Sequence, residues 1–138
     1  MKKNKIIISI LIIVISVVFA VYKVYNKPHV NVADTKSEIT LTADKIINDF
    51  SLDETKANGL YLDKIIKVYG KIDKLNLVKE KGIITLKTKD DFGSVLCHLS
   101  EKGTKKMSLL KEGQSISIKG ICTGYLLDVI LVNGEVTN

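Results

Sequence analysis

An uncharged apolar segment near the N-terminus constrains this chain more than any other feature of its sequence. Residues 6–22 have the sequence IIISILIIVISVVFAVY, 17 positions without a charge, a proline or a glycine. A helix that crosses a bilayer needs about 20 mostly apolar residues, with about 17 as the lower limit. Tyr22 and Tyr25 lie at the far end, where aromatic side chains favour the level of the lipid headgroups. The segment therefore predicts a transmembrane anchor.

A cleaved signal peptide is the alternative interpretation of the same segment. Val18 and Ala20 suit the −3 and −1 positions of a cleavage site. Against cleavage, the run is longer than the roughly 7 to 15 apolar residues of a typical signal peptide. No cluster of small residues interrupts the helix before Lys23, and no cysteine near the start is placed to accept a lipid. An uncleaved anchor is the favoured interpretation.

The charges beside the apolar run predict on which side of the membrane the rest of the chain lies. Lys2, Lys3 and Lys5 precede the run. Positive residues in a short tail keep that tail in the cytoplasm, although the lysines after the run weaken this bias. We therefore expect a cytoplasmic tail at residues 1–5, a single-pass anchor at 6–22 and an extracytoplasmic remainder.

The net charge of +6 gives only weak support for a nucleic-acid partner. Without the three lysines of the tail, 18 lysines stand against 15 acidic residues, which leaves a difference of +3 for the exported part. The chain contains no arginine, whose planar guanidinium binds phosphate and guanine through two hydrogen bonds where lysine acts as a point charge. A lysine-rich, solvated surface explains the composition.

A polar segment and a short helical region follow the apolar run. Residues 23–41 lack apolar periodicity, which predicts a linker before a domain at 42–138. Thr42 suits a helix N-cap, and apolar side chains recur after it at helical spacing. Ser51 and Glu54 have the S-x-x-E spacing of a capping box, which predicts that a second short helix starts there.

From Leu62 onward the apolar period changes to two, as in β-strands. The pattern predicts five strands, the last at 126–132 after a turn at Gly124, with a helical stretch at 101–111 between the third and fourth. This β-β-β-α-β-β order is the connectivity of the five-stranded OB-fold barrel, a mainly β class. Gly70 in the first strand fits the bend that this strand makes. An SH3-like barrel, the main alternative, has no place for the helical stretch.

Three segments taken together resemble a known family. They are LTADKIINDFSLDETKANGLYLDKIIKVYGKI at 41–72, SVLCHL at 94–99 and LKEGQSISIKGICTGYLLDVIL at 110–131. In this combination the chain resembles the tRNA-anti-like family of bacterial OB-fold proteins, over about residues 26–132. The resemblance implies an OB fold, often with a membrane anchor or a lipid modification. It implies neither tRNA binding nor particular site residues, because the family name refers to a structural likeness to anticodon-binding domains.

Cys97 and Cys122 are the most informative chemical pair. Strand parity points both side chains into the barrel, where they form a disulfide in an oxidising compartment or remain two buried thiols. His98 faces the opposite way from Cys97, and His29 lies alone in the predicted linker, so no metal site with a recognised spacing is present. No nucleophile, acid and base can be assembled, so we expect neither catalysis nor a cofactor.

The predicted ligand face comprises the first three strands and the loops beside them. The candidate residues are Tyr69, Lys71, Phe92, His98 and Tyr125. Location and fold together favour a binding module for an envelope protein, peptide or glycan. Single-stranded nucleic acid, stacked on Tyr69 and Tyr125 and contacted by Lys67 and Lys71, is the alternative, and predicts steep salt dependence. A structural role within a larger membrane complex is a third hypothesis.

Overall fold

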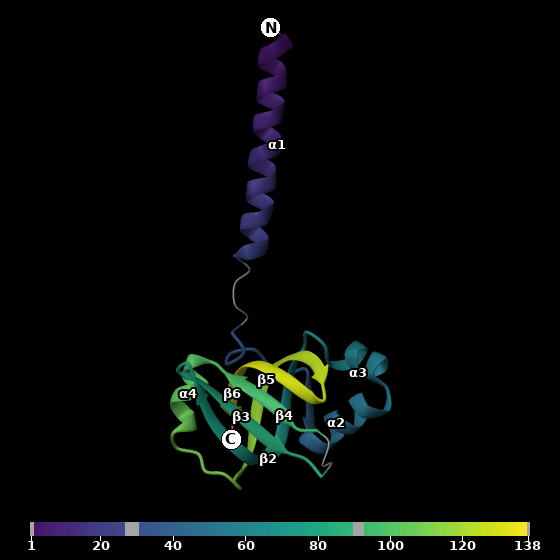
Figure 1. The fold of residues 1–138 in the computed structure, drawn as a ribbon, viewed down its shortest axis with the longest axis vertical. Helices are drawn as coiled ribbons and strands as arrows, with labels where there is room; N and C mark the ends of the chain where they lie inside the picture. Colours follow the sequence, from purple (N-terminus) through teal and green to yellow (C-terminus); the bar gives the residue numbers. More distant parts are fainter. Residues whose placement is uncertain (1, 27–30, 90–92, 138) are drawn as a thin grey trace. The chain divides into compact units, whose positions relative to one another are not determined.

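A computed structural model describes residues 2–26, 31–89 and 93–137 of this chain. The chain divides into two compact units, residues 1–30 and residues 31–138. The first unit contains helix α1 (Lys2–Tyr25), labelled in Figure 1. Within α1, the 20 residues Ile6–Tyr25 have a mean hydropathy of 2.8 and are long and apolar enough to cross a membrane. A signal sequence has the same length and composition, so the helix alone does not separate an anchor from a cleaved leader.

The second unit is a closed β-barrel with short helices at its margins (Figure 1). Its elements in chain order are β1 (Ile39–Thr42), α2 (Ala43–Leu52), α3 (Glu54–Tyr61), β2 (Ile65–Val78), β3 (Lys81–Lys87), β4 (Val95–Leu99), α4 (Glu101–Met107), β5 (Ser115–Leu126) and β6 (Asp128–Thr137). The strands neighbour one another in the order β1-β2-β3-β4-β6-β5, and a further β2–β5 pairing closes the barrel. Strands β2 to β6, with α4 after β4, have the connectivity of the OB fold, which confirms the prediction.

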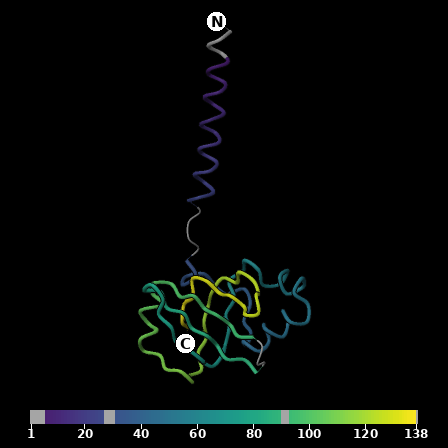
Figure 2. The backbone as a smooth tube through the Cα atoms, viewed as in Figure 1, coloured from purple at the N-terminus to yellow at the C-terminus, as the bar shows by residue number. Residues whose placement is uncertain are grey.

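Closure of the barrel depends on β2, whose course can be followed in the backbone tube of Figure 2. Its first half pairs with β5 and its second half with β3, and both partners meet it at Lys71. The register with β3 slips just after Ile72, which marks a bulge. A Cβ atom at Gly70 would lie 3.1 Å from Leu86 Cβ and 3.2 Å from Ala43 Cβ. The missing side chain thus lets β3 and α2 approach β2 where it changes partner.

The core fills the barrel and extends under α2. Apolar side chains alternate inward along the strands, as the period of two predicted, and include Ile66, Val68, Ile84, Leu86, Val95, Leu131 and others. Helix α2 buries Ala43, Ile46, Ile47 and Phe50 against the barrel. The Phe50 ring packs against two tyrosines, with centroid distances of 5.9 Å to Tyr61 and 5.4 Å to Tyr125. This aromatic cluster joins α2, α3 and β5.

The first two helices of this unit begin at capping residues. Thr42 is the N-cap of α2, as predicted, and its side chain accepts a hydrogen bond from the Lys45 amide. The N-cap of α3 is Asp53, whose side chain accepts from the Lys56 amide. The prediction of a capping box at Ser51 was therefore wrong by two residues, because a carboxylate nearer the helix serves as the acceptor.

Part of the predicted linker at 23–41 belongs to the folded barrel unit. Val32 is only 3% exposed, and strand β1 pairs in parallel with β2. The Lys119 ammonium, on the outward face of β5, donates to the carbonyl oxygens of Ala33 at 2.9 Å and Thr35 at 2.8 Å. A segment with polar composition is held here because its backbone carbonyls satisfy a nearly buried charge.

The last hairpin turns three residues later than predicted. Gly124 continues β5, and the chain reverses at Leu127, whose φ is 68°, so that Leu126 pairs with Asp128. The Asp128 carboxylate accepts hydrogen bonds from the backbone amide and hydroxyl of Ser94, each at 2.7 Å. These bonds fix the start of β6 beside β4. They explain why a carboxylate, Asp128, stands between the apolar residues Leu127 and Val129.

Two glycines in helices provide a matched test of packing on this fold. A Cβ at Gly103 of α4 would overlap the carbonyl oxygen of Gly134 on β6, whereas a Cβ at Gly59 of α3 would meet nothing within 4 Å. We expect Gly103→Ala to lower the free energy of unfolding by about 2 kcal/mol. Gly59→Ala should raise it by about 0.5 to 1 kcal/mol. Chemical unfolding of the detergent-solubilised chain, followed by circular dichroism, measures both; an unchanged Gly103→Ala variant would contradict the α4–β6 contact.

Candidate ligand-binding cleft

A cleft of about 1040 Å³ opens where β2 passes from β5 to β3. The start of α2, the outer side of β2, the end of β3 and the start of β5 form its walls. The register explains why these elements converge, because Lys71 is opposite Lys87 on β3 and Ser115 on β5. The hollow is therefore a consequence of barrel closure.

The cleft carries an excess of positive charge. Among the described residues, Lys71, Lys87 and Lys89 are exposed and line it, together with one carboxylate, that of Asp44. Asp44 Oδ1 accepts a hydrogen bond from the Lys89 backbone amide at 2.7 Å. Lys71 and Lys87 are direct cross-strand partners, and like charges in such positions destabilise a sheet. Within the described parts of the chain, neither ammonium group forms a salt bridge.

Tyr69 supplies the aromatic surface of the cleft. It lies on the outer side of β2, is 45% exposed and pairs with Ser117 of β5. The Lys67 ammonium lies 5.4 Å from the centroid of its ring, within the range of a cation–π interaction. A partly exposed ring beside several cations suits a ligand that contains both aromatic groups and negative charge.

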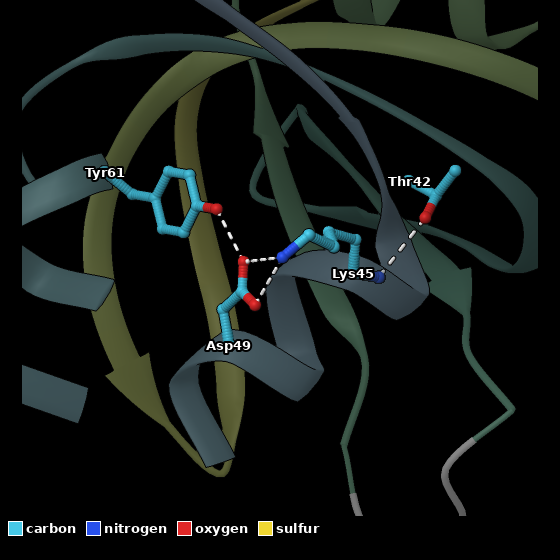
Figure 3. A network of polar contacts seen from close by, with 4 residues as sticks. All are labelled: Thr42, Lys45, Asp49 and Tyr61. Carbon is cyan, nitrogen blue, oxygen red and sulfur yellow. Dashed lines mark hydrogen bonds and ion pairs between the residues drawn. The ribbon is translucent and has the colours of Figure 1, made fainter. Parts of the chain in front are cut away.

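A polar network positions α2, whose N-terminus forms one wall of the cleft (Figure 3). The Lys45 ammonium donates to Asp49 Oδ1 and Oδ2 at 2.6 and 2.7 Å. The Tyr61 hydroxyl, from α3, donates to Asp49 Oδ2 at 2.6 Å. One carboxylate therefore joins α2 to α3, and the Thr42 cap holds the first turn of α2 beside the cleft.

The same network shifts two pKa values. Burial alone would raise the pKa of Asp49, but the hydrogen bonds from Lys45 and Tyr61 outweigh burial and lower it. Burial and the hydrogen bond to Asp49 raise the pKa of Tyr61 from 10.0 to about 12. Both shifts favour the arrangement in which a neutral phenol donates to an ionised carboxylate.

The structure brings together two of the five residues predicted as a ligand face. Tyr69 and Lys71 line the cleft. His98 is exposed on β4, away from the cleft lining, and Tyr125 packs against an aromatic ring of α2. Phe92 lies outside the described residues. The histidine is excluded from the cleft because it pairs with β3 near the opposite end of that strand.

Sequence reasoning missed Lys87, Lys89 and Asp44. The available signal was the alternation Lys87-Thr88-Lys89 at the end of a strand, which places both lysines on one side. The position of Lys87 opposite Lys71 depends on the bulge after Ile72, which the sequence pattern does not reveal.

Cys97 and Cys122 are both buried, as strand parity predicted, and both thiols are free. Each is a register partner of Leu131, so β6 lies between the two cysteines. Two strand spacings of about 4.8 Å exceed the roughly 7 Å that a disulfide spans between Cα atoms. Burial raises the pKa of both thiols, which act here as small apolar side chains.

No metal site is apparent in the described residues. Residues 2–26, 31–89 and 93–137 contain no group of three or more His, Cys, Asp and Glu side chains able to hold an ion. The chemistry available in the cleft is therefore ionic attraction, stacking and hydrogen bonding by exposed side chains.

The raised pKa of Tyr61 makes a prediction for alkaline pH. Because the folded pKa lies above the unfolded one, the hydrogen bond to Asp49 stabilises the fold fully below pH 10 and is lost as the pH rises towards 12. We expect Tyr61→Phe to cost about 1 kcal/mol at neutral pH, and this difference from the unsubstituted chain to shrink between pH 10 and 12. Chemical unfolding across this pH range tests it, with Tyr69→Phe as a control. A difference that stays constant with pH would contradict the assignment.

This chain matches one protein family in sequence and several solved structures in fold. The tRNA_anti-like family matches residues 1–136, and no curated protein sequence matches the chain. A candidate nucleic acid-binding lipoprotein of Klebsiella pneumoniae has a TM-score of 0.61 at 20% identity, over 81% of this chain and 100% of that chain. The Stn1–Ten1 complex of S. pombe gives a TM-score of 0.43 at 14% identity, over 54% of this chain and 58% of that chain. A candidate aspartyl-tRNA synthetase of Leishmania major gives 0.48 at 12% identity, over 79% and 22%. With its OB-fold barrel and its match over nearly the whole length, the chain belongs to the tRNA_anti-like family.

Proposed function

We propose that this chain is a membrane-anchored OB-fold module that binds single-stranded nucleic acid in the cleft beside Lys71. The observation that carries the proposal is the cross-strand pair Lys71–Lys87, two exposed ammonium groups facing the same cleft of about 1040 Å³. It is a binding function, and no catalytic step is part of it.

An anionic ligand is favoured because it relieves a repulsion built into the sheet. Lys71 and Lys87 oppose each other without an acidic partner among the described residues, and Lys89 adds a third positive charge. The N-terminus of α2 in the same wall contributes a further positive partial charge. A neutral ligand would leave the repulsion in place, so the cleft does not favour a neutral member of the envelope proteins, peptides and glycans expected from the sequence.

Single-stranded nucleic acid combines the two properties that the cleft offers. Its phosphates supply negative charge at regular intervals, and its bases stack on aromatic rings such as Tyr69. Lysines bind phosphates as point charges, so we expect contact with the backbone and little discrimination between sequences. The description of the Klebsiella lipoprotein as a candidate nucleic acid-binder agrees with this proposal, which rests on the cleft itself.

Helix α1 supports the membrane part of the proposal. Its mostly apolar span of 20 residues, Ile6–Tyr25, fits the thickness of a bilayer, and the lysines before the span favour a cytoplasmic N-terminus. The barrel would then bind nucleic acid outside the cytoplasm.

The sidedness can be tested with one engineered thiol. Thr123 is exposed on β5, whereas both native cysteines are buried. We expect a membrane-impermeant maleimide to label Thr123→Cys in intact spheroplasts and to leave the unsubstituted chain unlabelled. Labelling only after lysis would place the barrel in the cytoplasm.

Binding in the cleft can be measured by fluorescence anisotropy with a labelled oligothymidylate and the detergent-solubilised full chain. We expect binding at about 50 mM salt with a steep loss at higher salt. Lys71→Gln with Lys87→Gln should weaken binding more than about tenfold and lower the log–log salt slope by about 0.7 for each phosphate that is no longer neutralised. Tyr69→Ala should also weaken binding, because the ring on which a base stacks is lost, while Tyr69→Phe keeps the ring and should bind as the unsubstituted chain does.

Lys36→Gln is the matched control, because Lys36 is exposed and lies outside the cleft lining. The absence of binding by the unsubstituted chain at about 50 mM salt would refute nucleic acid as the ligand. An equal loss in the Lys36→Gln variant would show attraction to overall charge and would refute the cleft as the site.

A further inference from the structure

A second exposed surface lies at the opposite end of β3 from the cleft. We name it the basic pole and define it as residues 77–81, the β2–β3 hairpin, and residues 101–109, which include α4. The two segments are neighbours, since the amide of Gly82, the residue directly after the hairpin, donates to Thr104 Oγ1 at 3.0 Å. Strand β3 runs from Lys81 at this pole to the cleft, a distance of about 20 Å at 3.3 Å per residue.

The basic pole exposes large apolar side chains. Leu77 is 63% exposed, Val78 52% and Leu109 82%. The first two end β2, and the third follows α4. Large apolar side chains exposed on a surface can mark a contact with a partner or a membrane.

The same pole concentrates positive charge. Its lysines are Lys79, Lys81, Lys102, Lys105 and Lys106, all exposed. Its acidic residues are Glu80 and Glu101, so five lysines against two acids leave a difference of +3. The whole unit from residue 31 has 16 lysines against 15 acidic residues, a difference of only +1. The pole is therefore more basic than the rest of the barrel.

Another apolar group on the barrel has the opposite electrostatic character. Leu126 and Leu127 at the β5–β6 turn are 81% and 74% exposed. Leu62 lies beside this turn, 3.9 Å from a Cβ at Gly124. The charged residues beside Leu62 and this turn are Asp63, Lys64 and Asp128, two acids against one lysine. The two apolar surfaces therefore differ in the sign of the charge beside them. Of the two, the basic pole is the one complementary to a negative partner.

We propose that the basic pole docks on an anionic lipid surface, with the lysines contacting headgroups and Leu77, Val78 and Leu109 entering the interface. Mixed lysine and leucine surfaces bind at the level of the headgroups, and anionic lipids attract lysines near the surface.

This inference rests on the membrane anchor of the proposed function. The compact unit begins at Asn31, six residues after the end of α1, so the covalent chain spans at most about 22 Å between them. That short connection gives even weak docking a high effective concentration of lipid.

The test uses the full chain in nanodiscs of phosphatidylcholine alone or with about one third phosphatidylglycerol. An environment-sensitive fluorophore on Ser108→Cys reports on the basic pole, and one on Thr123→Cys reports on the β5–β6 hairpin as a matched control. Both positions are exposed, and the two native thiols are buried. We expect the anionic lipid to shift the Ser108→Cys emission to shorter wavelength and to leave the Thr123→Cys emission unchanged. The shift should vanish at about 1 M salt, which screens the attraction.

Lysine substitutions separate this inference from the cleft. Lys79→Gln, Lys81→Gln and Lys105→Gln together should abolish the lipid-dependent shift while oligothymidylate binding remains. Equal spectra in the two lipids, an equal shift at Thr123→Cys, or a shift that survives these substitutions would overturn the proposal. If oligothymidylate reverses the shift, the basic pole binds nucleic acid, and the lipid-docking proposal is overturned as well. A chain that does not co-elute with nanodiscs contradicts the anchor, and its sedimentation with phosphatidylglycerol vesicles then tests the pole separately.

Discussion

The sharing of β2 between two partner strands is the constraint on which this structure depends. Strand β5 pairs with its first half and β3 with its second, and the absence of a side chain at Gly70 lets Leu86 of β3 and Ala43 of α2 pack closely where the partner changes. Without this double pairing the sheet would have two open edges and its apolar face would lie in water. The segments that are distant in sequence meet because β2 bends.

The cleft follows from the same bend. At Lys71 the strand leaves one partner and joins the other, and the space between them is bordered by α2, whose position is fixed by Asp49 and the aromatic cluster around Phe50. Two lysines are brought opposite each other at a point where the sheet alone gives them no counter-charge. Among the described residues the two ammonium groups have no acidic partner, which is the physical basis for the anionic ligand proposed here.

The barrel could be predicted from the sequence because its signals are local. Alternating side chains, the Gly70 bend and the Thr42 cap each act within a few residues. The cleft could be predicted only in part, because Tyr69 and Lys71 lie on a recognisable strand, whereas Lys87 reaches them through a register set by a bulge. Tyr125 was assigned to a loop because Gly124 resembles a turn residue, but the bonds from Ser94 to Asp128 move the turn beyond it.

The segment that precedes β1 decides where this domain begins. Lys119 is 9% exposed, and its ammonium relies on two carbonyl oxygens contributed by residues 33 and 35. A soluble fragment cut at residue 42, the boundary that polar composition indicates, would lack both acceptors and would expose Lys119 and the neighbouring side of β5 to water. A fragment that starts at residue 31 keeps both carbonyl acceptors of Lys119. The folded unit therefore includes residues 31–41, although their polar composition resembles that of a linker.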